Sequence, residues 1–242
     1  MKGSWRTSVL ALLVVIAIPV LSDAAAAQEA PPLIYGVQIE QFEHRLSNDN
    51  DFWAWDGDAI LGRDEWKLRL QSEGEYDRDA KRFETLENQL LVQYMVSDFF
   101  DAKAGVRFDT PRGSDRTFAV LGLQGLAQQW FEVDLDLFVS DRGDLSARLD
   151  LDYELLITNR LILTPTVEID VAASDDRAVG VAAGLVSSEV GLRLSYDLID
   201  RALAPYVGVL YEQKYGQSAK LARADGEHAE EVYLVAGIKL LF

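Results

Sequence analysis

Residues 130–157 read WFEVDLDLFVSDRGDLSARLDLDYELLI, and two runs in this stretch alternate apolar with charged residues. In residues 131–139 every odd position is apolar, and positions 132, 134 and 136 are acidic. In residues 147–155 the odd positions are again apolar, and the even ones are charged. A period of two indicates strands with one apolar and one polar face. The linking SDRGD suits a three-residue hairpin loop with Gly143 in the left-handed conformation.

The same period dominates the chain after residue 33 and predicts about twelve strands, with ten as the alternative. The predicted ranges are 33–43, 52–60, 65–76, 83–96, 101–109, 117–126, 131–140, 144–156, 161–172, 187–199, 204–215 and 231–242. Strands of soluble domains cluster near 5 to 6 residues, whereas a tilted strand needs about 9 to 11 to cross a bilayer. Several of these ranges have the longer length. The last is predicted to pair with the first, which leaves no open edge.

The connections between these strands alternate in length. Short links, such as LGRD at 61–64 and ITNR at 157–160, alternate with long polar ones, such as 173–186 and 216–230. Outer-membrane barrels have short periplasmic turns and longer outer loops. A secreted β-sandwich is the alternative, and it would show the same alternation in shorter strands. We therefore predict an all-β fold, a transmembrane antiparallel β-barrel at residues 33–242, in the outer membrane of a Gram-negative bacterium.

The N-terminus predicts a secretory signal peptide at residues 1–27. Lys2 and Arg6 precede an apolar run at 9–21, and DAAAAQ supplies small residues for cleavage. The run is shorter than the roughly 20 residues that a spanning helix needs. Residues 28–32 are then a short periplasmic N-terminus ahead of the barrel.

Charge and cysteine content restrict the partners. The chain has 23 basic and 40 acidic residues, a net charge of −17, which disfavours nucleic acid as a partner and favours cations. Cysteine is absent, so no disulfide or thiolate metal site exists. Around a barrel, the remaining partners are the lipids of the outer membrane.

In a barrel the polar faces line the lumen, and the hairpin loops set their register. Pairing of residue 140 with 144, and of 157 with 161, predicts two rows of charges. One row is balanced and contains the structural lumen pairs of Asp136, Arg148 and Asp170. The other is unbalanced and contains Asp134, Asp150 and Glu168.

Like charges opposite each other on neighbouring strands are destabilising. The unbalanced row therefore needs a cation, a proton or a base that reaches inward. The candidate bases are Arg107, Lys67, Arg69 and Arg193. Two interpretations remain: a salt-bridge network that fills a narrow barrel, and a transient path for cations.

Few residues suit catalysis. His44 stands three residues before Ser47 on a predicted outer loop, which would allow an outer-membrane lipid hydrolase, but spacing alone provides no oriented base and no oxyanion site. His228, within GEHAEE, is interpreted as a solvated loop histidine, with a loop metal ligand as the alternative. The prediction is that the protein is not an enzyme.

Several stretches resemble the copper-resistance protein B family of outer-membrane proteins. They include EWKLRLQSEGE, DAKAGVRFDTPRGSDRTFAVLGLQGLAQQWFEVD, RLDLDYELLITNRLILTPTVE and VAGIKLLF, and the resemblance covers about residues 64–242. It implies an outer-membrane barrel that aids copper export or sequestration across the envelope. It also implies a partner, a periplasmic multicopper oxidase of the same resistance system.

Typical members of that family carry a Met- and His-rich segment before the barrel, whereas this sequence has QEAPP between the predicted cleavage site and Leu33. Cu(I) favours thioether and thiolate ligands, which are scarce here, and Cu(II) accepts imidazole and carboxylate. The copper ligands that remain are His44, His228 and the acidic lumen, and we expect weak binding of copper. The alternative function is a narrow cation-preferring porin without a copper role.

Overall fold

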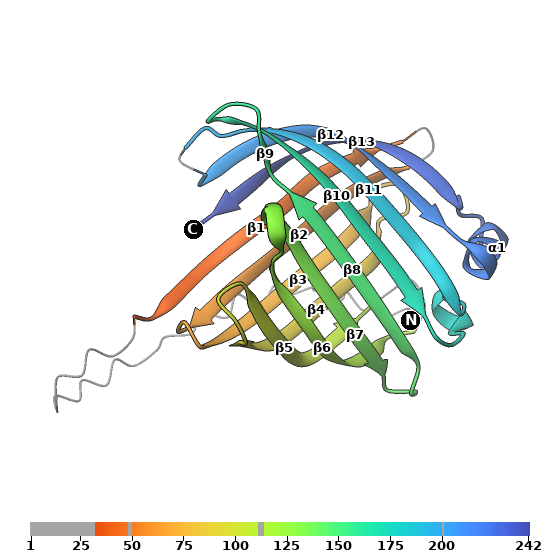
Figure 1. Cartoon of the computed structure of the whole chain (residues 1–242). Helices are drawn as coiled ribbons and strands as arrows, with labels where there is room; N and C mark the ends of the chain where they lie inside the picture. Colours follow the sequence, from red (N-terminus) through yellow and green to blue (C-terminus); the bar gives the residue numbers. More distant parts are fainter. Residues whose placement is uncertain (1–31, 48–49, 111–113, 200) are drawn as a thin grey trace, which may run out of the picture. The chain divides into compact units, whose positions relative to one another are not determined.

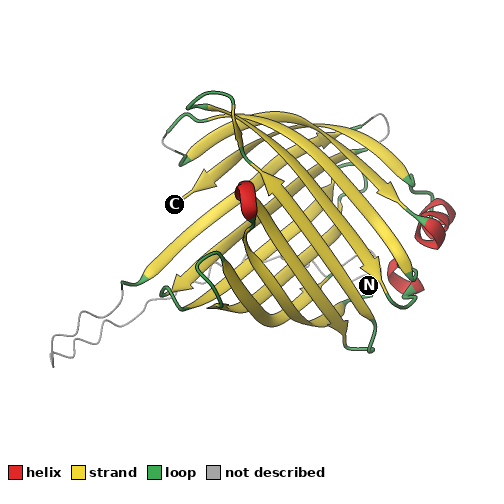
Figure 2. Ribbon diagram, in the orientation of Figure 1, coloured by secondary structure: helices red, strands yellow, loops and turns green. Residues whose placement is uncertain are grey.

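The computed structural model describes residues 32–47, 50–110, 114–199 and 201–242. The predicted signal peptide, 1–27, lies outside these residues, as do residues 28–31 of the predicted N-terminal segment. The strands are β1 (Ile34–Leu46), β2 (Asp51–Gly62), β3 (Trp66–Asp77), β4 (Arg82–Met95), β5 (Phe100–Asp109), β6 (Arg116–Leu126), β7 (Phe131–Ser140), β8 (Leu145–Tyr153), β9 (Leu155–Leu156), β10 (Leu161–Ala172), β11 (Gly184–Tyr196), β12 (Leu203–Lys214) and β13 (Glu230–Leu241). The helical segments are η1 (Gln128–Trp130), η2 (Arg177–Val179) and α1 (Gly216–Ala224), and they lie in connections (Figure 2).

The strands form one antiparallel sheet that closes on itself (Figure 1). Each strand pairs with its neighbours in sequence, and β13 pairs with β1 along Gln38–Leu46. The two-residue β9 continues β8 beyond Glu154 and pairs with β10 in the same register. Within the described residues the wall therefore has twelve strands, which confirms the predicted barrel and excludes the alternative of ten.

The outer face of the barrel is apolar, as the alternation predicts. In β13, Val232 and Leu234 are 59% and 63% exposed, whereas Tyr233 and Val235, which point inward, are 5% and 3% exposed. Such a band of outward apolar side chains matches the lipid-facing surface of a transmembrane barrel. No helix in the described part of the chain is both long enough and apolar enough to cross a membrane.

The hairpin that decided the register has the predicted geometry. Ser140 N donates to Asp144 O at 2.8 Å, and Gly143 has a φ of 86°, a conformation that L side chains rarely adopt. The β1–β2 connection differs from the prediction. β1 continues to Leu46 rather than ending at 43, so His44 lies in a strand and not in a loop.

The two ends of the barrel differ. The short-turn end holds the connections β2–β3, β4–β5, β6–β7, β8–β10 and β11–β12, together with the C-terminus. The long-loop end holds the others, including those with η2 and α1. Figure 1 shows α1 and the C-terminus at opposite ends.

At the long-loop end, Arg116 at the start of β6 holds the loop after β10. Its Nε donates to Asp176 Oδ2 at 2.6 Å and its Nη2 to Asp176 Oδ1 at 2.9 Å. These hydrogen bonds from Arg116 hold the pKa of the Asp176 carboxyl below its ordinary value. A lowered folded-state pKa means that the pair stabilises the loop above about pH 4 and that this stabilisation is lost as the pH falls through the lowered pKa.

We therefore expect Arg116→Gln to raise the pKa of Asp176 toward about 3.9, the value for an unperturbed aspartate. The measurement is an NMR titration of the Asp176 carboxyl carbon in detergent-folded protein, with Asp175, also in this loop, as the internal control. An unchanged midpoint for Asp176 in the variant would contradict the assignment.

Candidate functional site

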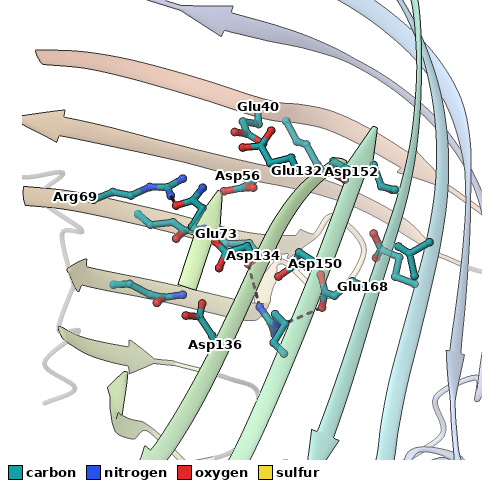
Figure 3. A pocket seen from close by; sticks show the side chains of 18 of the residues that line it. Glu40, Asp56, Arg69, Glu73, Glu132, Asp134, Asp136, Asp150, Asp152 and Glu168 are labelled. Atoms are coloured by element: carbon teal, nitrogen blue, oxygen red, sulfur yellow. Dashed lines mark hydrogen bonds and ion pairs between the residues drawn. The ribbon is translucent and has the colours of Figure 1, made fainter. Parts of the chain in front are cut away.

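An acidic cavity of about 110 Å³ lies inside the barrel (Figure 3). Its carboxylates belong to Glu40, Asp56, Glu73, Glu132, Asp134, Asp136, Asp150, Asp152, Glu168 and Glu189. Its bases are Arg45, Arg69 and Arg148. Ten carboxylates against three guanidinium groups create a strongly negative field, because the low-dielectric walls concentrate it.

The register of the predicted rows is confirmed. The Cα partners across β7, β8 and β10 include Asp136 with Arg148, Arg148 with Asp170, Asp134 with Asp150, and Asp150 with Glu168. In Figure 3, Asp134, Asp150 and Glu168 follow one another across neighbouring strands. The three acids of the unbalanced row therefore lie side by side in the wall.

The base that reaches this row is Lys103 of β5, which the sequence analysis missed. Its side chain has no exposed surface, and Nζ lies 2.6 Å from Asp134 Oδ1 and 2.8 Å from Asp136 Oδ2. Asp136 thus pairs with Lys103, although the balanced row predicted a pairing with Arg148. The sequence did contain a signal for Lys103. It lies four residues before Arg107, and this even spacing places both side chains on the inner face of β5.

Gly122 of β6 makes this contact possible. It lies between Lys103 and Asp136 in the register of the three strands. A Cβ at this position would stand 2.1 Å from Asp136 Oδ1 and 2.6 Å from Lys103 Cε. Because glycine has no side chain, the lysine can cross β6 to reach the carboxylates on β7.

Arg148 is the other base that serves the predicted rows. Its Nε lies 3.0 Å from Asp170 Oδ1 and 3.4 Å from Glu168 Oε1. Its Nη1 lies 3.1 Å from Glu87 of β4 and 3.4 Å from Glu73 of β3. Strands β3 and β4 are not neighbours of β8, so this guanidinium group crosses the lumen.

The four bases that the sequence analysis proposed for the unbalanced row form their ion pairs elsewhere, so that prediction was wrong. Arg107 pairs with Glu87 and Asp109, Lys67 with Asp101, Arg69 with Asp58, and Arg193 with Glu43. The strand period placed each base correctly on the inner face. It did not say how far across the lumen each side chain reaches.

Glu43 is the centre of a second buried network and is itself fully buried. It accepts hydrogen bonds from Arg193 Nε at 3.0 Å, Arg193 Nη2 at 2.9 Å, Arg45 Nε at 2.7 Å and the Tyr206 hydroxyl at 2.9 Å. An irregularity in β1 at Ile39–Gln41 shifts the register with β2, and both Glu40 and Gln41 line the cavity. This bulge also turns Glu43 inward, because it reverses the alternation of β1 at that point.

Two buried apolar clusters also lie inside the barrel. Leu91, Val120 and Phe138 form one buried apolar cluster, which Phe118 contacts. Tyr206, Leu210, Tyr233 and Val235 form another, which Phe52 contacts. At the short-turn end, by contrast, a mouth of about 800 Å³ is lined by residues such as Trp130, Tyr153 and Leu241.

The two histidines lie outside this cavity. The His44 ring packs against Trp53 at a tilt, with 4.9 Å between ring centroids, and its Nε2 contacts Asp51. Ser47 Oγ donates to Glu231. His228 is exposed in the connection between α1 and β13. The proposed hydrolase pair, His44 and Ser47, therefore has separate carboxylate partners.

The acidic side chains attract cations by their charge, but direct coordination of a metal ion also requires several ligands close together. Across residues 32–47, 50–110, 114–199 and 201–242, no group of three or more His, Cys, Asp or Glu side chains is close enough together to hold a metal ion. The candidates Asp134, Asp150 and Glu168 share a row without converging on one point.

Comparisons with known proteins found similar sequences and a similar fold. The family profile described as copper resistance protein B precursor matches residues 33–242. Copper resistance protein B of Escherichia coli is 39% identical over 208 residues, which is 86% of this chain and 69% of the relative. A copper resistance protein B homolog of Pseudomonas syringae pv. tomato is 40% identical over 84% of this chain and 68% of the relative. The NanC porin structure shares the fold, with a TM-score of 0.53 at 12% identity over 86% of this chain and 99% of that one.

Proposed function

The chain belongs to the copper resistance protein B family, and on this premise we propose that it is an outer-membrane barrel that aids copper export or sequestration across the envelope of a Gram-negative bacterium. The observation that carries the proposal is the acidic cavity, where ten carboxylates face three guanidinium groups. This field concentrates cations in the lumen. Copper ions are the cargo, and we propose that the carboxylates hold them weakly.

The orientation of the barrel supports the periplasm as the source of the ion. Outer-membrane barrels have their short turns on the periplasmic side. The wide mouth at the short-turn end would then open to the periplasm. On the basis of the family resemblance, we propose a periplasmic multicopper oxidase as the partner there, and co-purification of the two proteins from solubilised envelopes tests this.

A narrow cation-preferring porin is the second candidate. The acidic lumen favours it, because carboxylates that line a pore select for cations. It differs from the first proposal in one observable property, which is continuous conduction of monovalent cations through reconstituted barrels.

The proposal is for a protein without enzymatic activity. A hydrolase that uses Ser47 and His44 would need the imidazole to act as a base on the serine hydroxyl. The His44 ring contacts Asp51 and the Ser47 hydroxyl donates to Glu231, so the geometry lends the hydrolase no support. Lipid hydrolysis that disappears in His44→Ala would overturn this.

The test is copper tolerance of a Gram-negative strain from which the gene has been deleted. We expect deletion to sensitise cells to copper and the wild-type gene to restore growth. Asp134→Asn with Asp150→Asn should restore it less well, because two lumen charges are lost. Asp175→Asn, in the loop outside the lumen, is the control, and outer-membrane levels of each variant are compared by immunoblot. Normal copper tolerance in the deletion strain would refute the copper role.

A further inference from the structure

The cavity contains two kinds of carboxylate. Asp134 and Asp136 are paired with Lys103, Glu73 and Glu168 with Arg148, and Glu189 with Arg45. The others have no base within ion-pair distance among the residues that the structure describes, and they are Glu40, Asp56, Glu132, Asp150 and Asp152. Glu40 lies close to Glu132 and Asp152 (Figure 3). Half of the cavity's carboxylates therefore form no ion pair with a base among the described residues.

A second, independent observation concerns hydrogen bonding. Gln89 is 5% exposed and lines the cavity, and its Oε1 is buried without a hydrogen-bond partner. Gln71 Oε1 and Asp136 Oδ1 are also buried acceptors without a hydrogen-bond partner. Arg69 Nε is a buried donor without a partner. A buried polar atom without a partner costs about 1–3 kcal/mol. Three oxygen acceptors around one cavity indicate a ligand that supplies positive charge or hydrogen-bond donors.

The cavity is large enough for an ion with water around it. A water molecule needs roughly 10–15 Å³ of such volume, so a cavity of about 110 Å³ holds several. No three acidic side chains in the described ranges converge closely enough for direct coordination. A hydrated divalent cation fits both facts, since its water ligands donate to Gln89 Oε1 and to the carboxylates.

The cavity is open toward one end of the barrel. Glu40, Glu132 and Asp152 line both the cavity and the mouth at the short-turn end. The mouth itself has five carboxylates and two bases, Arg201 and Lys239, so its field also attracts cations.

Toward the long-loop end, two arginines cross the lumen, and we call them the arginine bar. Arg45 of β1 reaches Glu75 of β3 at 2.6 Å and Glu189 of β11 at 3.4 Å. Arg148 of β8 reaches Glu87 of β4 at 3.1 Å. Each guanidinium group and the carboxylates that it pairs with extend across this part of the lumen, and this leaves less room for a cation to pass.

From these contacts we infer that the cavity is a binding site for a hydrated divalent cation, loaded from the short-turn end and closed toward the long-loop end by the arginine bar. The inference rests on the proposed function in that copper, as Cu(II), is the cargo. In this conformation the barrel holds the ion rather than passing it.

Binding is tested by calorimetric titration of CuSO4 and MgCl2 into detergent-folded barrel. We expect saturable binding, and Asp150→Asn with Asp152→Asn should weaken it about tenfold, which corresponds to about 1.4 kcal/mol. Gln89→Leu, which leaves every charge in place, should also weaken it. Asp175→Asn, outside the cavity, should bind as wild type. If both cavity variants bind as wild type does, the site does not exist.

Closure is tested by conductance in planar bilayers. We expect the wild type to conduct little, and Arg45→Gln with Arg148→Gln to raise the cation conductance at least severalfold. High wild-type conductance would refute closure and favour the porin.

Electrophoretic heat-shift assays show that each variant is folded, and Arg148→Gln alone replaces the double variant if that fails to fold. If the cavity binds the cation but deletion of the gene leaves copper tolerance unchanged, the proposed function is refuted and the binding site is still supported.

Discussion

Replacement of Glu43 by alanine should lower the free energy of unfolding of the barrel by about 3–5 kcal/mol. The carboxylate is fully buried and accepts hydrogen bonds from Arg193, Arg45 and Tyr206. Without it, the Arg193 guanidinium group, whose side chain is 2% exposed, stays in the lumen beside Arg45 with no carboxylate between them. The cost is that of a buried charge left without its partner, added to the lost hydrogen bonds.

The measurement is urea unfolding of the barrel in lipid bilayers, followed by tryptophan fluorescence. Glu154→Ala is the matched control, because it removes a carboxylate that pairs with Arg201 at 3.2 Å where both side chains are about half exposed. Such a pair contributes at most about 1 kcal/mol. If Glu43→Ala destabilises the barrel no more than Glu154→Ala does, the network around Glu43 is not a stabilising element.

Replacement of Lys103 by methionine should have an effect of similar size, about 3–5 kcal/mol. Methionine keeps most of the length of the side chain and removes the ammonium group that lies between Asp134 and Asp136. Two carboxylates then share a buried site without a base, next to Asp150 on the neighbouring strand. Repulsion among these acids adds to the loss of the two ion pairs.

A second substitution separates charge from packing. Asp136→Asn in the Lys103→Met background removes one of the two carboxylate charges that have lost their ion pair with Lys103. It should therefore restore part of the lost stability. In a double-mutant cycle the coupling between the two positions should lie at the upper end of about 0.5–3 kcal/mol. Lys67→Met, whose pair with Asp101 is partly exposed, should cost less. Additive effects of Lys103→Met and Asp136→Asn would mean that the lysine acts by filling space.

The sequence alone determined the barrel and much of its lumen. The period of two placed the charged residues of the two strands on the inner face, and the three-residue loop at Gly143 set which strand positions are partners. These features are predictable because they depend on short stretches of chain: alternation is a property of consecutive residues, and a tight hairpin leaves one register for its two strands. The same reasoning placed Asp150 beside Glu168 across the next turn.

The tertiary structure alone decided which base neutralises which acid. Lys103 reaches Asp136 because Gly122 leaves a gap on the strand between them, and Arg148 meets Glu87 because the closed wall brings β4 opposite β8. The bulge in β1 turns Glu43 inward, and the longer β1 moves His44 out of its predicted loop. None of this follows from local pattern, since the reach of a side chain across a lumen depends on the curvature of the whole sheet and on the residues that lie between.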